Sequence, residues 1–118
     1  RLRLRSMDVV ELVWQAMEPT RISYTVFVHL VAPDGKVVSQ DDSIPGRGTL
    51  PTTSWVRGEV LSDSYTLAIP ATATPGQYHI AVGLYDARTE KRLPIWDASG
   101  ASIGDSLLLV KVHVERAP

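Results

Sequence analysis

The side chains of this chain that could do chemistry are a few aromatic, acidic and histidine residues on two predicted strands. The ranges 24–31 and 77–85 alternate along the chain as strands do. If these strands lie side by side, Phe27, His29 and Tyr85 share one outward surface. Small or polar residues complete that surface: Thr25, Ala81 and Gly83. Two aromatic rings beside small residues form a flat shelf that suits the apolar face of a sugar ring.

Carboxylates are predicted at the rim of this shelf, where they would accept hydrogen bonds from a bound hydroxyl group. The candidates are Asp41 or Asp42, which follow the turn after the first strand, and Asp63 on a later strand. Together with His29 they would give the aromatic shelf its polar contacts. The predicted ligand-binding set is therefore Phe27, His29, Asp42, Trp55, Asp63 and Tyr85.

Trp55 belongs to this set because of the loop that carries it, and the loop leaves two alternatives open. The segment 43–58 is too rich in proline and glycine for a regular strand or helix through most of its length. In one alternative it folds across the shelf, and Trp55 packs on Phe27 or Tyr85 so that nothing remains to bind. In the other it stands away, and the three rings line an open groove that binds a saccharide weakly.

No pattern of catalytic or metal-binding residues accompanies these candidates. The three histidines, His29, His79 and His113, fall on separate predicted strands without the spacing of metal ligands. The chain has no cysteine, which excludes disulfides, thiolate metal sites and cysteine nucleophiles. The range 97–100 lacks the spaced carboxylates of a calcium loop and is predicted to be a turn. We therefore expect a fragment without catalytic residues, metal or cofactor.

The length, composition and net charge fit one ordinary globular domain that covers residues 1–118. Hydrophobic residues make up 44% of the chain, and the net charge of -1 gives no reason to expect nucleic acid or an anionic membrane surface as a partner. No apolar run approaches the roughly 20 residues that span a bilayer, and the sequence predicts no signal peptide within these residues. Since the first residue is Arg1 and not methionine, we expect a domain excised from a longer polypeptide.

The elements that must position the candidates are organised around a hairpin over 24–42. Its first strand is followed by Pro33, Asp34 and Gly35, a sequence typical of a type I turn in which the glycine takes a positive φ. Further strands are predicted over 7–16, 60–69 and 77–85, and a short rung over 93–96. Within 7–16, Trp14 is predicted to point into the core. Tyr78 stands where a tyrosine corner stands in immunoglobulin-like sandwiches.

The two ends of the chain are predicted to form edge and closing strands. Arg1 to Arg5 alternates arginine with leucine, as in a short edge strand. The last strand is expected over 107–115, with Lys111, His113 and Glu115 facing outward. The side chains expected to face inward are Leu108, Val110, Val112 and Val114. Seven or eight short strands without helices indicate an all-β fold, an immunoglobulin-like antiparallel β-sandwich with Greek-key connections.

Several short segments together resemble a known family. They are Trp14-Gln-Ala16, Tyr24 to Leu30, Pro33-Asp-Gly35, Gln40-Asp-Asp42, Pro51-Thr52 with Trp55, Gly58-Glu-Val60, Asp63 with Tyr65, Pro75-Gly-Gln-Tyr78, Val82 to Asp86 and Arg92-Leu93. The likeness spans Met7 to Glu115. It is to the soluble C-terminal domain of some bacterial multi-spanning membrane glycosyltransferases, those similar to dolichyl-phosphate-mannose-protein mannosyltransferases and aminoarabinose transferases.

This resemblance implies a non-catalytic, extracytoplasmic accessory domain that is tethered to the membrane through its parent chain. Its partners would be a glycan, which it binds or positions as acceptor, or the membrane-embedded part of the parent chain. The catalytic acidic residues of such transferases lie in their membrane portion, and none is carried over to this sequence. The alternative is a protein-interaction or structural immunoglobulin-like module. That class includes the bacterial intracellular proteinase inhibitors, which the Gly58-Glu59 and Pro75 to Tyr78 segments resemble.

Overall fold

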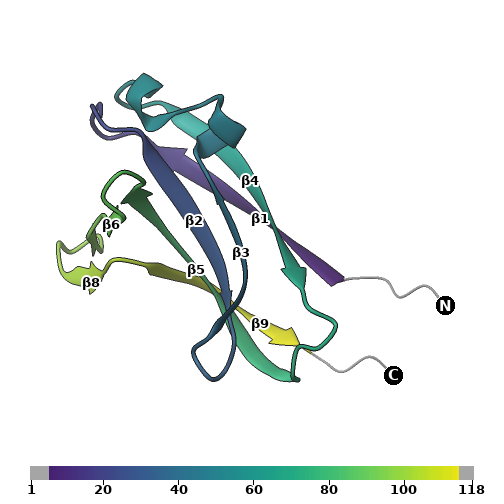
Figure 1. Ribbon diagram of the computed structural model, residues 1–118. Coiled ribbons are helices and arrows are strands. Elements are labelled where there is room, and N and C mark those ends of the chain that lie inside the picture. Colours follow the sequence, from purple (N-terminus) through teal and green to yellow (C-terminus); the bar gives the residue numbers. More distant parts are fainter. Residues whose placement is uncertain (1–5, 115–118) are drawn as a thin grey trace.

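The structure, a computed structural model, describes residues 6–114 (Figure 1). Strands account for most of this range, and the two helical segments are single 3-10 turns, η1 (Pro45–Gly48) and η2 (Thr52–Ser54). The strands are β1 (Ser6–Gln15), β2 (Tyr24–Val31), β3 (Val37–Ser43), β4 (Val60–Ile69), β5 (Gly76–Asp86), β6 (Lys91–Arg92), β7 (Ile95–Trp96), β8 (Ser102–Gly104) and β9 (Leu107–Val114). The predicted edge strand over Arg1 to Arg5 lies outside the described residues, as does Glu115.

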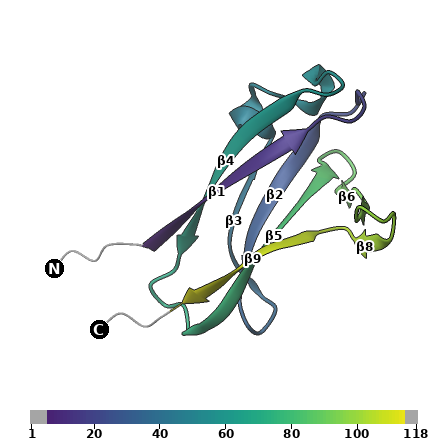
Figure 2. The ribbon, with the colours of Figure 1, turned by 180° about the vertical axis from the view of Figure 1, so that it is seen from behind.

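The strands form two antiparallel layers that face each other. One layer is the pair β1–β4, and the other has the order β3–β2–β5–β9, with β6 added at one end of β5. Strands β7 and β8 form a separate small ladder beside the second layer (Figures 1 and 2). The all-β sandwich expected from the sequence is confirmed, whereas its Greek-key connections stay a prediction.

The β2–β3 hairpin has the predicted turn. Gly35 has a φ of 87°, the left-handed region that glycine enters without steric cost. Its amide donates to the Ala32 carbonyl at 2.9 Å, and the Ala32 amide donates to the Lys36 carbonyl at 2.8 Å. The Asp34 carboxylate accepts a hydrogen bond from the Lys36 amide at 3.0 Å, which ties the turn to itself. This turn fixes which residues of β3 lie beside β2.

Alternating residues of the central strands fill the core between the layers. Val26, Val28 and Leu30 of β2 are buried, as are Leu61, Tyr65 and Leu67 of β4 and Ile80 and Val82 of β5. Tyr78 is also buried, and its hydroxyl donates to the Thr74 carbonyl at 2.8 Å, as the predicted tyrosine corner requires. Trp14 packs against this core, so its predicted inward direction is confirmed.

The predicted facing of β9 is wrong in its first half. Val110 and Val112 lie opposite Ile80 and Tyr78, on the inner face as expected, but the register shifts between Ile80 and Ala81. Beyond the shift Leu108 lies opposite Ala81 on the outer face, and Leu107 takes the inner position opposite Val82. A β-bulge places one extra residue in a strand and reverses the facing of everything beyond it.

Candidate functional site

The outer face of the second layer carries a shallow polar hollow of about 270 Å³. Its lining comes from four strands and the turn before β6: Phe27, His29, Gln40, Asp42, Tyr85, Glu90 and Arg92. The β2–β5 register places Thr25 opposite Tyr85, Phe27 opposite Gly83 and His29 opposite Ala81. The shared outward surface predicted from the sequence is therefore present. We call this site the polar hollow.

Asp42 is the acceptor at the centre of the polar hollow. It reaches this place because β3 pairs with β2 so that Asp42 lies opposite Phe27. Its Oδ2 accepts a hydrogen bond from the Tyr85 hydroxyl at 3.1 Å. Its Oδ1 is buried and lies 3.7 Å from His29 Nε2, too far for a hydrogen bond, and has no hydrogen-bond partner among the described residues.

Burial sets the protonation of the two titratable neighbours of Asp42. It lowers the pKa of His29 below its ordinary value, because an imidazolium loses water contacts there; Asp42 opposes this shift and Arg92 adds to it. Burial also raises the pKa of the Tyr85 hydroxyl, and the Asp42 carboxylate adds to that rise. At neutral pH the polar hollow therefore holds a neutral imidazole and a neutral phenol.

The open aromatic shelf predicted from the sequence is not present, because Arg92 covers Phe27. The Arg92 guanidinium carbon lies 4.3 Å from the centre of the Phe27 ring, and Phe27 is only 1% exposed. The Phe27 ring also lies against Gly83, where an added Cβ atom would come within 2.3 Å of the ring. Phe27 is thus held between a glycine and an arginine, and Tyr85 and the outer face of Arg92 are the flat surfaces left for a ligand.

Trp55 lies in neither of the two places that the sequence suggested. It packs in a small cluster with Ala16 and Leu61, its ring centre 6.1 Å from that of Trp14. Its indole N–H donates to the Leu50 carbonyl at 2.9 Å. The segment 43–58 therefore closes one end of the core between the layers. It neither covers the polar hollow nor adds a ring to it.

Asp63 is also absent from the polar hollow. Its alternation along β4 turns it inward, and its carboxylate is buried. There it accepts hydrogen bonds from the Tyr65 hydroxyl and from the Gly46 amide, the latter at 2.9 Å. The other rim candidate, Asp41, pairs with Arg47 and accepts a hydrogen bond from the Thr66 amide at 2.9 Å. Both carboxylates join β4 to the β3–η1 segment.

Sequence reasoning missed Arg92, Gln40 and Glu90. Arg92 enters the site because β6 pairs with the end of β5 and lies with Arg92 opposite Tyr85. The signal was present in the polar, turn-forming stretch between these strands, which the structure shows to be a tight hairpin closed by the Glu90 amide on the Asp86 carbonyl at 2.7 Å. A two-residue strand such as β6 is too short to show alternation.

Neither metal-ligand geometry nor similarity to known proteins assigns a role to the polar hollow. Within residues 6–114, no group of three or more acidic, histidine or cysteine side chains is arranged to hold a metal ion. None of the helical turns in the same range has the length and apolar character of a membrane span. Searches against protein-family models, curated proteins and solved structures each found no match.

Proposed function

We propose that this domain is a non-catalytic binding module whose polar hollow takes a small polyhydroxylated ligand, a saccharide. The observation that carries the proposal is Asp42 Oδ1, a buried acceptor atom without a hydrogen-bond partner among the described residues. Leaving such an atom unpaired costs free energy. A ligand hydroxyl that reaches it by displacing a neighbouring side chain removes this cost.

The neighbours of Asp42 offer the complementary contacts that a sugar uses. Arg92 and Gln40 carry N–H donors for ligand oxygens, while Asp42 and Glu90 carry acceptors for ligand hydroxyl hydrogens. The Tyr85 ring supplies an apolar surface beside them. Because the hollow is shallow and Phe27 is covered, we expect weak binding, with a dissociation constant of about 1 mM, near 4 kcal/mol of affinity.

The test is a titration of the 118-residue chain with a panel of mono- and disaccharides, followed by amide chemical shifts. We expect shifts at residues around the polar hollow and a loss of about 5-fold or more in affinity for Asp42→Asn, which replaces an acceptor by a donor-bearing amide. Asp34→Asn is the matched control, since Asp34 lies in the exposed β2–β3 turn. No response to the panel at about 50 mM would refute the proposal.

The resemblance to membrane glycosyltransferases gives this proposal a biological setting. In that setting the module lies outside the cytoplasm, tethered by its parent chain, and holds a glycan for the membrane-embedded enzyme. The complete reading frame of the gene tests this part separately. Upstream membrane-spanning segments would support it, and a complete frame without them would exclude it.

A second candidate function is protein interaction, as in the alternative raised from the sequence. It is favoured by an apolar cleft between β1 and β9, which is separate from the polar hollow and larger.

A further inference from the structure

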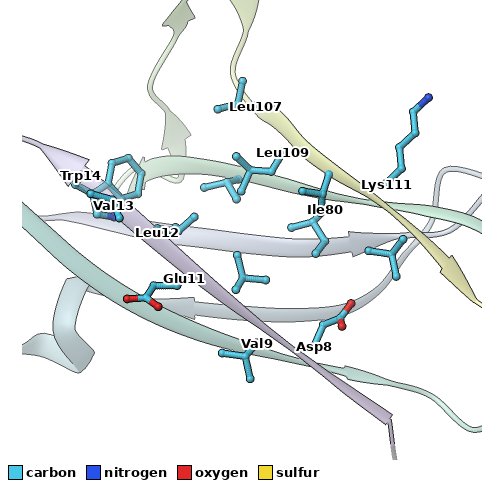
Figure 3. A pocket seen from close by; sticks show the side chains of 14 residues that line it. Asp8, Val9, Glu11, Leu12, Val13, Trp14, Ile80, Leu107, Leu109 and Lys111 are labelled. Atoms are coloured by element: carbon cyan, nitrogen blue, oxygen red, sulfur yellow. The ribbon is translucent and has the colours of Figure 1, made fainter.

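Two further cavities of the described residues differ in the side chains that line them. Strands β1 and β9 do not pair with each other within residues 6–114, and the sandwich is open between them, at a cleft of about 650 Å³. The walls of this cleft are mainly apolar and include Leu12, Ile80, Leu107 and Leu109 (Figure 3). The other cavity, of about 370 Å³, carries two arginines, Arg21 and Arg88. Two cationic side chains at one cavity favour an anionic ligand.

This second cavity, which we call the loop-end cavity, lies where three connections meet at one end of the sandwich (Figure 1). They are the segment before β2, the segment 43–58 and the turn between β5 and β6. Its lining includes Arg21, Ile22, Ser23, Ile44, Thr53 and Arg88. No residue that lines the polar hollow also lines the loop-end cavity, so the two sites are separate.

Hydrogen bonds fix the backbone on two sides of the loop-end cavity. The buried Thr52 hydroxyl donates to the Ile22 carbonyl at 2.8 Å and accepts from the first amide of β2 at 3.0 Å. These two bonds tie the segment before β2 to η2. On the other side, the Asp86 carboxylate accepts from the Arg88 amide at 3.0 Å. The exposed side chains of Arg21 and Arg88 therefore start from ordered stretches of backbone.

The two guanidinium groups at the loop-end cavity have spare hydrogen-bond donors. Arg21 forms no hydrogen bond or ion pair with another residue of 6–114. Arg88 Nε lies 3.6 Å from Asp86 Oδ1, beyond hydrogen-bond distance, and the Arg88 side chain is 80% exposed. In contrast, Arg47 and Arg92 each donate to a carboxylate elsewhere on the molecule. A guanidinium carries five N–H donors in a planar fork that matches a carboxylate or a phosphate.

The charges around the loop-end cavity favour the same class of ligand. Arg21 and Arg88 bring two positive charges and Asp86 brings one negative charge, which leaves an excess of positive charge on a chain that is slightly acidic as a whole. The two guanidinium groups repel each other. An anion bound between them is attracted by both.

We propose that the loop-end cavity binds a small organic oxyanion, a carboxylate or phosphate group on a short carbon skeleton, between Arg21 and Arg88. Both guanidinium groups donate charge-assisted hydrogen bonds to the anionic oxygens. The hydroxyl groups of Ser23 and Thr53 are further donors at the same cavity. This site goes beyond the saccharide proposed for the polar hollow and does not depend on it.

The apolar part of the lining contacts the carbon skeleton of the ligand. Ile22 and Ile44 come from different connections and both line the cavity. A volume of about 370 Å³ is within the range of cavities that hold small molecules. Because both arginines are exposed and well hydrated, we expect a dissociation constant of about 1 mM.

Titrations of the 118-residue chain with inorganic phosphate and, separately, with acetate test the proposal. They are done at neutral pH and constant ionic strength, with sodium chloride as the balance. We expect saturable amide chemical shifts at residues 21–23 and 86–88, and an affinity that falls as the ionic strength is raised. The probe that binds more tightly identifies the anionic group. Butyrate should bind about 4-fold more tightly than acetate, because its longer chain is covered by Ile22 and Ile44.

Arginine substitutions show whether the binding belongs to this cavity. Arg21→Gln and Arg88→Gln should each lower the affinity by about 5-fold or more, because each removes one guanidinium from the anion. Arg57→Gln is the matched control, since Arg57 is also exposed but does not line the cavity. This control removes the same charge and should change the affinity by less than about 2-fold.

The proposal is overturned if neither anion produces saturable shifts around the loop-end cavity up to about 50 mM. It is also overturned if Arg57→Gln lowers the affinity as much as the two cavity substitutions, because the anion then responds only to the net charge of the chain. Butyrate that binds no more tightly than acetate would reject the contact with Ile22 and Ile44. None of these results depends on whether the polar hollow binds a saccharide.

Discussion

His29 shows how one side chain of the polar hollow links the site to the stability of the domain. Its pKa is lowered in the folded chain, so the unfolded chain binds a proton there more readily. The stability that the neutral imidazole supports is present above its ordinary pKa of 6.5 and is lost as the pH falls below it toward the lower folded value. Asp42 and Arg92 set the extent of the shift with opposite signs.

We therefore expect the free energy of unfolding to fall as the pH is lowered from neutral through 6.5, and to fall less in His29→Gln, which cannot take up the proton. Urea unfolding at several pH values measures both proteins. The effect of His29 is the difference between the two curves, since carboxylates titrate in both. Two curves that run parallel through this range would show that His29 is not responsible.

Single residues also mark the limit of prediction from sequence. Phe27, His29, Asp42 and Tyr85 were brought together correctly, because their facing follows from alternation along two paired strands and one short turn. Trp55 was misplaced because it sits in a loop, where no periodicity tells which neighbours it meets. Asp63 was misplaced although it alternates in phase with Tyr65, which lies on the same strand and bonds to it. Its other partner, the Gly46 amide, belongs to a different segment, and no local pattern shows that contact.

At the scale of elements, the contact between β2 and β5 depends on the missing side chain of Gly83. A Cβ atom there would meet the Phe27 ring at 2.3 Å and the Asp105 carbonyl oxygen at 2.8 Å. Gly83→Ala should therefore lower the free energy of unfolding by about 1 to 3 kcal/mol through overpacking. In a Phe27→Ala background the same change should cost less, because the ring is gone. Urea unfolding of the four proteins gives the coupling, and additive costs would contradict the argument.

The strands also differ in how well the sequence predicts their bounds and their facing. The bounds of β1, β2 and β4 follow their alternation closely, since one face of each strand packs into the core between the layers. In β9 the run Leu107 to Val110 offers four apolar residues in succession, so the sequence carries no sign of which ones face inward or where the bulge lies. The two-residue strands β6 and β7 have too few positions to produce a pattern.

For the whole molecule, Trp14 connects the two parts of the core. One cluster is built from β2, β4 and β5, and the smaller one surrounds Trp55; Trp14 packs against both. We expect a single unfolding step, with the β-type circular dichroism signal and tryptophan fluorescence lost together. Trp55→Ala should lower the stability by about 3 to 5 kcal/mol and still unfold in one step. Separate transitions for the two signals would show that the clusters are independent.

The fold class of the whole molecule was predictable because strand alternation, turn chemistry and the lack of helical periodicity all agree. The open side between β1 and β9 was not. Whether two edges come together depends on how many strands each layer has, and within residues 6–114 the first layer consists of β1 and β4. No local pattern in the sequence states that number.

The pairing of β1 with β4 has a consequence while the chain is being synthesised. Ser6 pairs with Ile69 and Gln15 with Val60, so the residues of β1 wait for partners that lie between 45 and 63 positions further along the chain. At a ribosomal rate of about 5 to 20 residues per second, a completed β1 waits roughly 3 to 11 s for all of β4 to be synthesised. The β2–β3 hairpin, closed by a local turn, is complete well before then. Of the strands in residues 6–114, β1 therefore remains longest without any partner during synthesis.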